Sequence, residues 1–472
     1  MNSHNFCPGF TFVRTAYHKD PHSGTSMHSD AALYSNSDMA DMKANLTRVE
    51  EDDEEDGEGD DEEDNDEDDE EESDEDDEEE EDSDFEDEEH PGAANQGAED
   101  DSEYSIFCYW PLIQIIIEFK CKSFMDPYRY AFSDKKTILD NPSHCATRSR
   151  GQMLTYAGLQ MAHQFRRSVF AVGIYGSYAR FFHIDPSSVV VSERFSIHDS
   201  AKILVEFFLR YAALTPTQRG FDPTVTPATE AEKILFRSHV KSYLERVKKE
   251  NLRKYPGIDN VGTTGFPISK VGVSDEDGNL HLYLVCRPDS PIRNFVPCGR
   301  FTRGFIAVPI ASALSSTGAP AASANVENSG GDSQSQNVGD GRLYWLKDCW
   351  RPANSESETA MYKHLDSTKV PNLTEVICGG DVYFDGSLQQ TENDSLLVDP
   401  KVAWRRPTLP IRRMVHHRLV QALLIPLYSD LNERELLRVG RDVLESGFIL
   451  MIFFMFFEVL ITSPRSDRRG IS

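Results

Sequence analysis

The feature that most constrains this chain is a run of acidic residues between positions 50 and 89. The run contains 34 Asp or Glu residues and no Lys or Arg. Such a polyanion cannot bury enough apolar surface to offset the entropy that is lost when a chain becomes ordered. We therefore predict that residues 1–104, which include this run, are disordered.

The acidic run accounts for the whole of the net negative charge of the chain. The chain has 80 acidic and 48 basic residues and a formal charge of −32; without the run, 46 acids face 48 bases. The rest is therefore almost neutral and lacks the positive field that attracts nucleic-acid phosphates, so no nucleic-acid partner is predicted. We interpret the run as a solvated spacer, with a docking surface for basic protein partners as the alternative.

Cysteine usage and the two termini bear on the compartment. Eight cysteines are scattered without a CxxC pair, which favours a reducing compartment over a disulfide framework or a zinc ribbon. The first thirty residues lack an apolar stretch of signal-peptide length, so an intracellular protein, cytoplasmic or nuclear, is predicted. Residues 448–461 are apolar, but they reach only about 21 Å of a ~30 Å hydrocarbon core. They also contain Glu458, so no membrane span is predicted.

From about residue 105 the hydrophobic pattern predicts an α+β protein. Strands are expected at 112–120, 171–174, 179–184, 188–191, 268–273, 280–286, 305–309, 342–347, 375–378 and 417–424. Helices are expected at 151–169, 201–214, 226–255, 356–365 and 433–445, with Asp199 or Ser200 capping the second and Thr226 the third. The expected division is an α+β domain at 105–290, a second unit at 291–446 with a flexible insertion at 312–341, and a tail at 447–472.

One group of residues in the second unit has the spacing of a nucleotide site. A turn bounded by Gly299 and Gly304 precedes a strand, Lys347 lies on the next strand, and Glu358 lies on the helix after it. In the small lobe of a protein kinase, a glycine-rich turn covers the phosphates, a strand lysine pairs with them, and a helix glutamate holds the lysine. The spacing alone also fits a lysine on an exposed strand.

Several short motifs resemble the fungal-type protein kinase family, in number and in order, over roughly residues 110–446. They are Arg150-Gly151-Gln152 with Tyr156-Ala157, Gln164 with Arg166, Thr217-Gln218-Arg219-Gly220 with Asp222-Pro223, Gly299-Arg300 with Thr302-Arg303-Gly304, Leu346-Lys347-Asp348 with Trp350-Arg351, Val370-Pro371, Glu375-Val376-Ile377-Cys378-Gly379-Gly380-Asp381-Val382, His417-Arg418-Leu419-Val420 and Glu435-Leu436-Leu437 with Asp442-Val443-Leu444-Glu445.

The resemblance implies a kinase-like small lobe that binds ATP with Mg²⁺. Lys347 would be the phosphate-pairing lysine, Glu358 its partner, and Gly299 and Gly304 the ends of the phosphate loop. The sequence departs from the family at Phe301, where a glycine is usual and a side chain can obstruct the approach of a phosphate.

The second departure concerns the catalytic machinery. No His-Arg-Asp motif with a downstream Asn and no Asp-Phe-Gly motif follow the helix at 433–445. The helical large lobe is missing, and the family pattern stops at Glu445, so we interpret the chain as truncated and the tail at 447–472 as aberrant. We predict a catalytically dead family member that has no catalytic residue and no metal ligand. An acidic, non-enzymatic scaffold or interaction protein is the alternative.

A second group of polar residues lies in the first unit. Glu118 and Lys120 end a buried strand at i and i+2, so their side chains point to the same side, and Gln152 and Tyr156 follow on a helix. This arrangement is that of nucleases of the PD-(D/E)xK type, in which an acid binds Mg²⁺ and the lysine assists the attacking water. The upstream aspartate of such a site is not evident, and a salt bridge at a strand end in an inactive domain is the alternative. The pair His416-His417 is interpreted as strand surface.

Overall fold

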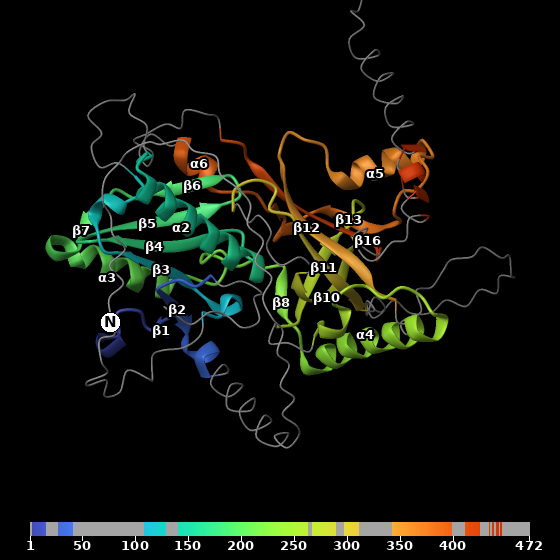
Figure 1. Ribbon diagram of the computed structural model, residues 1–472, viewed down its shortest axis with the longest axis horizontal. Helices are drawn as coiled ribbons and strands as arrows, with labels where there is room; N and C mark the ends of the chain where they lie inside the picture. The colour runs from blue at the N-terminus through green and yellow to red at the C-terminus, as the bar shows by residue number, and fades with distance from the viewer. Residues whose placement is uncertain are drawn as a thin grey trace, which may run out of the picture.

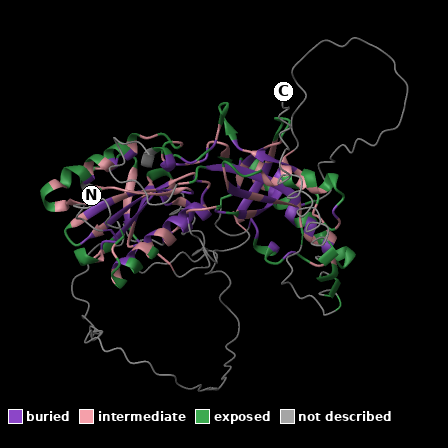
Figure 2. Cartoon of the chain, turned by 90° about the horizontal axis from the view of Figure 1, so that it is seen from above, coloured by how far each residue is buried: buried purple, intermediate pink, exposed green. Residues whose placement is uncertain are grey.

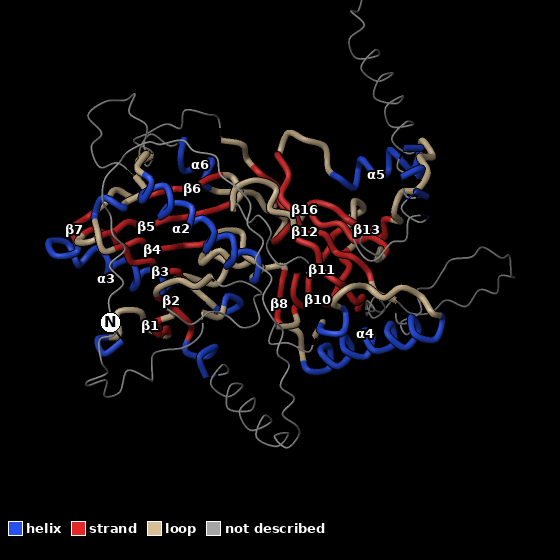
Figure 3. Tube along the Cα trace, in the orientation of Figure 1, coloured by secondary structure: helices blue, strands red, loops and turns tan. Residues whose placement is uncertain are grey.

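The protein is described here from a computed structural model, which defines residues 2–15, 27–40, 108–128, 140–262, 267–288, 297–310, 342–398, 411–424 and eight helical positions between 434 and 445. These residues form two α+β units side by side, each built on one large sheet (Figures 1 and 3). Buried residues concentrate in the strands at the centre of each unit (Figure 2). The predicted α+β class is confirmed.

The sheet of the first unit has the strand order β1-β2-β3-β4-β5-β6, with β7 paired to β5. All pairs are antiparallel except β3 with β4, which are parallel and are joined through helix α2 (His144–His163). A parallel pair needs such a crossover because its strands run in the same direction. The strands are β1 (Phe10–Arg14), β2 (Ala31–Ser35), β3 (Ile115–Lys120), β4 (Val169–Tyr175), β5 (Tyr178–Asp185), β6 (Ser188–Val191) and β7 (Phe195–Ser196).

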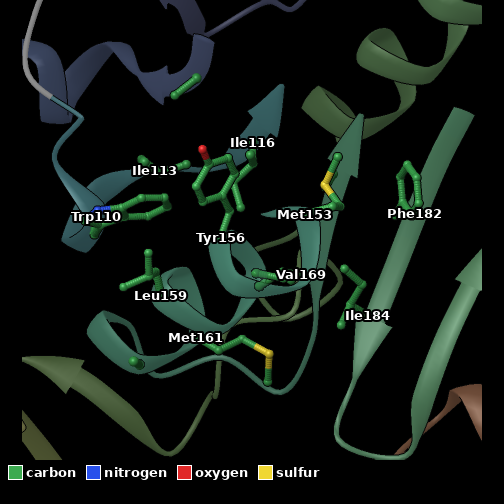
Figure 4. Close-up of a cluster of buried hydrophobic side chains, with 14 of the residues drawn as sticks. Trp110, Ile113, Ile116, Met153, Tyr156, Leu159, Met161, Val169, Phe182 and Ile184 are labelled. Atoms are coloured by element: carbon green, nitrogen blue, oxygen red, sulfur yellow. The ribbon is translucent and has the colours of Figure 1, made fainter. Parts of the chain in front are cut away.

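Helices cover both faces of this sheet. Helix α2 packs on one face through a large apolar cluster; Figure 4 labels Trp110, Ile113, Ile116, Met153, Tyr156, Leu159, Met161, Val169, Phe182 and Ile184. Helix α3 (Ile197–Ala213) packs on the other face through Leu204, Phe208 and Tyr211. Short 3₁₀ turns lie at η1 (Asn2–His4), η3 (Trp110–Leu112) and η4 (Ser123–Met125).

The prediction that residues 1–104 are disordered is wrong for strands β1 and β2. Strand β2 pairs with β1 on one side and with β3 on the other, and Leu33 and Tyr34 are fully buried. The two strands are short, and β3, which joins them to the sheet by pairing with β2, lies some eighty residues further along the chain. Pattern recognition within a local window cannot detect such a pairing. The acidic run at 50–89 lies outside the described residues.

The second unit has a strongly curved antiparallel sheet with the order β13-β16-β12-β11-β10-β9-β8, in which β9 also contacts β13 across the curve. Its strands are β8 (Val225–Pro227), β9 (Ser269–Ser274), β10 (Leu280–Pro288), β11 (Arg303–Ile310), β12 (Tyr344–Pro352), β13 (Val376–Asp381) and β16 (Met414–Ala422). Helix α4 (Glu230–Glu250) and the turn η5 (Ile258–Asn260) cover one part of the outer face, and α5 (Glu358–Ser367) lies beside β13 (Figure 1).

Three helix starts differ from the sequence-based expectation. The helix expected at 151–169 is α2, which begins at His144 after the cap Ser143 and ends at His163. The other two are α4 and α3. Helix α4 begins after Thr229, which forms a capping box with Glu232, and not after Thr226, which lies in β8. Helix α3 is capped by Ser196 and not by Asp199 or Ser200; Ser200 has non-helical dihedral angles and kinks the first turn. Near the starts of α3 and α4 the sequence has several residues that can cap a helix. Which of them is the cap depends on how the helix packs, and local sequence does not show this.

The domain boundary predicted at 290 is also wrong. The chain passes from the first sheet to the second between α3 and β8, so that α4, β9 and β10 belong to the second unit. After the hairpin of β14 (Tyr383–Phe384) and β15 (Ser387–Leu388), helix α6 (Asn393–Val398) returns to pack beside β5 and β6 of the first unit (Figure 1). The long charged helix misled the prediction because composition does not show which sheet a helix covers.

A buried ionic network joins the two units. Asp348 on β12 accepts hydrogen bonds from His416 Nε2 at 3.0 Å, Arg418 Nε at 3.0 Å and Arg303 Nη2 at 3.2 Å. Arg418 also pairs with Asp222, which lies just before β8. Arg303 extends the network into the first unit by donating to the carbonyl of Met161, in the last turn of α2, at 2.7 Å. The same strands that form the second sheet therefore hold the two units together.

The insertion at 312–341 and the tail at 447–472 lie outside the described residues. Within the part of the chain that the structure describes, no helix is long and apolar enough to span a bilayer.

Candidate nucleotide site

The structure brings Lys347 and Glu358 together. Lys347 Nζ lies 2.7 Å from both carboxylate oxygens of Glu358. Lys347 projects from the middle of β12, and Glu358 is the first residue of α5, which the Ser357 hydroxyl caps. Both side chains are half-buried, with 23% of the lysine and 15% of the glutamate exposed. The lysine therefore remains reachable while its position is fixed.

A second cation lies beside this pair. Arg300 Nη2 lies 3.4 Å from Glu358 Oε2, and the arginine side chain is 59% exposed. Two cations thus share one carboxylate, which leaves one excess positive charge at the end of α5. Burial raises the pKa of the nearby Cys349 thiol to about 11. The positive charges of Lys347 and Arg300 oppose this rise. The sequence analysis named Arg300 in a family motif but gave it no role in the site, because it lies on a turn before β11 and far from α5 in the sequence.

Of the two predicted glycines, Gly299 lies in the turn before β11 and Gly304 is the second residue of β11, and each has a structural role. Gly299 has a φ of +117°, and its N–H donates to the Pro186 carbonyl of the first unit at 2.7 Å. Gly304 lies opposite Lys347 in the β11–β12 register, and the Trp345 ring lies where a Cβ on Gly304 would be, 1.8 Å from it. Any side chain on Gly304 would therefore displace the tryptophan.

Phe301 does not obstruct the site, contrary to what the sequence suggested. Its side chain is only 7% exposed and is part of the apolar cluster that contains Trp350, Met414 and the α2 side chains of the first unit. Its φ of +37° is unusual for a residue with a side chain. The turn is thus anchored to the first unit by Gly299 and Phe301.

The histidine pair at 416–417 is buried and bonded to acids, so its interpretation as strand surface is wrong. His416 bonds Asp348 and stacks on Trp350, with ring centroids 4.6 Å apart. His417 Nδ1 lies 3.0 Å from Asp381 Oδ1, and Arg351 also pairs with that carboxylate. Asp381 is a half-buried acid whose pKa falls to about 2, because these two partners outweigh the effect of burial.

The second predicted group is also assembled, in the first unit. Lys120 Nζ lies 2.6 Å from Glu118 Oε1, and Gln152 Nε2 donates to the Tyr156 hydroxyl at 2.8 Å on the adjacent helix α2. The aspartate that the sequence left unidentified has a candidate in Asp30, whose Oδ2 accepts from the Phe119 N–H at 2.8 Å. Asp30 was overlooked because it lies in the segment that was expected to be disordered.

Comparison with known proteins identifies one family. The family model described as "Fungal protein kinase" matches residues 137–266. This segment is similar to the fungal protein kinase family. The predicted resemblance is confirmed over this segment. No curated protein and no solved structure matches the chain.

The fungal protein kinase segment extends over both units. It runs from before α2, through the strands β4–β7 and helix α3 of the first unit, to β8, α4 and η5 of the second. Lys347 and Glu358 lie outside the matched residues. Their assignment therefore depends on geometry and on the motifs of the sequence.

Proposed function

We propose that the second unit is a kinase-type small lobe and binds the phosphates of ATP at Lys347, Glu358 and Arg300. The observation that carries this proposal is the two-oxygen contact of Glu358 with Lys347, which fixes a half-exposed lysine on a strand next to a helix. An ion pair of this kind between a strand lysine and a helix glutamate is what holds the phosphate-pairing lysine in protein kinases.

The charge balance supports a phosphate ligand. Lys347 and Arg300 together carry one more positive charge than Glu358 neutralises, and an arginine that is more than half exposed is available to a ligand. Gly299 and Gly304 would bound the turn beside the phosphates. The hinge beside the adenine would be the segment 421–424, which begins in the last residues of β16, as the family pattern implies. Bound ATP would supply a transferable phosphoryl group.

We assign no Mg²⁺ ligand in this unit. Asp381 is an acid on β13, which is separated from β12 by β16, but Arg351 and His417 already occupy its oxygens. The sequence contains no His-Arg-Asp motif after β16 to supply a base. We therefore infer that this chain binds ATP without transferring its phosphate.

Titration with a fluorescent ATP analogue tests the binding proposal. Lys347→Met should weaken binding at least tenfold, because a charge-assisted phosphate contact is worth roughly 1.4 kcal/mol or more. The matched control is Lys363→Met. Lys363 lies on α5 itself and pairs with a glutamate, Glu276, on the protein surface. This control should bind like the wild type. Equal affinity of the Lys347→Met variant and the wild type, or no saturation of the wild type at millimolar nucleotide, would refute the proposal.

A phosphate-transfer assay tests the inference that the chain binds ATP without transferring its phosphate. Phosphate transfer from radiolabelled ATP to generic protein substrates, or to the chain itself, should not exceed the level of the Lys347→Met variant. Transfer by the wild type that this variant lacks would show that the chain has a catalytic base and a metal site that we have not identified.

A further inference from the structure

Two carboxylates lie opposite one another where the interior strands β2 and β3 of the first sheet end their pairing. Strands β2 and β3 are antiparallel with Ala31 paired to Ile117, so continuing the register by one residue sets Asp30 opposite Glu118. Directly opposed residues in an antiparallel pair share a face, with Cβ atoms ~4.5–5.5 Å apart. The hydrogen bond from the Phe119 N–H to Asp30 Oδ2 confirms that the aspartate reaches β3. Opposed like charges destabilise a sheet, so this pair requires a compensating charge.

Glu118 is only partly compensated. Its side chain is 2% exposed; Oε1 accepts from Lys120, but Oε2 is buried and accepts no hydrogen bond from any described residue. Burial raises the pKa of Glu118 to about 7, the Lys120 ammonium opposes this rise, and the Asp30 carboxylate adds to it. Leaving a buried carboxylate oxygen without a partner is costly, and such atoms in folded proteins call for an explanation.

Helix α2 packs against the Asp30–Glu118 pair. Tyr156 points from α2 toward β3 beside Ile116 (Figure 4). Its hydroxyl already accepts from Gln152. The pKa of the Tyr156 hydroxyl is raised by burial and, next in size, by the charge of Glu118, so the two groups are close. The side chains around the unpartnered oxygen are therefore fixed by the helix packing.

We propose that Asp30 and Glu118 bind a divalent cation that prefers oxygen ligands, such as Mg²⁺ or Mn²⁺, at the carboxyl end of β3. A cation between the two carboxylates would engage the unpartnered Glu118 oxygen and relieve the repulsion between the opposed acids. This site is in the first unit and is independent of the proposed ATP site.

The ligand set favours this class of metal. Mg²⁺ is usually held by one or two carboxylates and keeps several waters, whereas structural zinc needs four His, Cys or carboxylate ligands. Across the residues that the structure describes, no group of three or more His, Cys, Asp or Glu side chains is arranged to hold a metal. Two carboxylates with water in the remaining positions therefore match magnesium or manganese and exclude a structural zinc site.

Iron-directed cleavage of the full chain tests the site, because Fe²⁺ takes the place of Mg²⁺ and cuts the backbone where it is bound. The chain is incubated with Fe²⁺, ascorbate and peroxide, and the cuts are mapped by mass spectrometry. Cuts near residues 30 and 118 are expected in the wild type, and excess Mg²⁺ should suppress them. The acidic run at 50–89 also attracts cations, so its cuts should persist in every variant and serve as an internal standard.

The variants make the test specific. Glu118→Gln and Asp30→Asn should each abolish the cuts near residues 30 and 118, whereas Glu206→Gln, on exposed helix surface of the same unit, should leave them unchanged. Circular dichroism identifies a variant that has failed to fold, and Asp30→Asn, outside the buried core, provides the second reading if Glu118→Gln does not fold. Wild-type cuts confined to the acidic run, or cuts near 118 that survive Asp30→Asn in a folded protein, would overturn the proposal.

Discussion

The two faces of strand β12 carry charged residues that differ in exposure: one is partly exposed and the other is fully buried. Lys347 points outward to Glu358 and remains partly exposed. Its neighbour in the sequence, Asp348, points inward, is completely buried, and is bound by His416, Arg303 and Arg418. One residue of sequence therefore separates a reachable ion pair from a buried network.

This difference in exposure distinguishes the Lys347–Glu358 pair, a candidate ligand site, from the Asp348 network, a structural element. The inner network has every oxygen of Asp348 occupied and connects the two units through Arg303 and Asp222, so no ligand is needed to complete it. The outer pair has an excess cation and solvent access, which a phosphate could use. Mutations on the inner face should therefore change stability, and those on the outer face should change binding.

The largest effect is expected from Asp348→Ala. Removing this carboxylate leaves three buried cationic or hydrogen-bonding partners uncompensated, and breaking a buried ion pair from one side costs about 3–5 kcal/mol. Urea unfolding should show this loss. Asp259→Ala breaks an exposed ion pair with Lys254 and should cost no more than about 1 kcal/mol. A cost for Asp348→Ala as small as that of the control would show that the inner network does not hold the units together.

A smaller effect is expected from acid. Burial alone would raise the pKa of Asp222, but Arg418 and His416 lower it to about 2, whereas its ordinary value is 3.8. A carboxyl with a lowered pKa in the folded state stabilises the fold above its ordinary pKa and loses this contribution as the pH falls toward 2. The contribution is about 2 kcal/mol, at roughly 1.4 kcal/mol per pKa unit.

The measurement compares the wild type with Asp222→Asn. The difference in their free energies of unfolding should be constant above pH 5 and should shrink by about 2 kcal/mol between pH 4 and pH 2. Asp348 acts in the same direction, because His416, Arg303 and Arg418 outweigh burial and hold its pKa well below the ordinary value. A difference that stays the same down to pH 2 would show that Asp222 is not ionised through these contacts.

Hydrophobic pattern predicted most of the longer strands and helices from residue 115 onward, because these elements have strong local periodicity, but it missed the short elements β7, β8, β14, β15 and α6. The β9–β10 hairpin, for example, follows from two apolar runs around Asp277-Gly278, and the structure has Gly278 at a φ of +84°. Strands β1 and β2 were missed because their stability comes from β3, which is distant in the sequence. The assignment of β8, α4, β9 and β10 to the second sheet was missed for the same reason.

The candidate sites show the same division. Lys347 and Glu358 could be named from the order of strand and helix, since that order fixes which side chains can meet. Arg300 and Asp30 could not, because each joins its site through a turn or a strand end whose place is set by tertiary packing. The inner face of β12 was also unpredictable: Asp348, His416 and Arg418 resemble surface residues in the sequence, and only their mutual contacts allow them to be buried.

The smallest effect on stability is expected from Lys347→Met, and this variant tests the contrast most directly. In this variant Glu358 still forms an ion pair with Arg300. A half-exposed ion pair contributes about 0–1 kcal/mol to the free energy of unfolding. The apolar methionine stem can still pack along β12 beside Trp345. Thermal melting of the free protein should therefore shift by no more than a few degrees. ATP should raise the melting temperature of the wild type but not that of the variant. A large loss of stability without ATP would mean that the outer pair is a structural element like the inner network, and the contrast between the two faces would not hold.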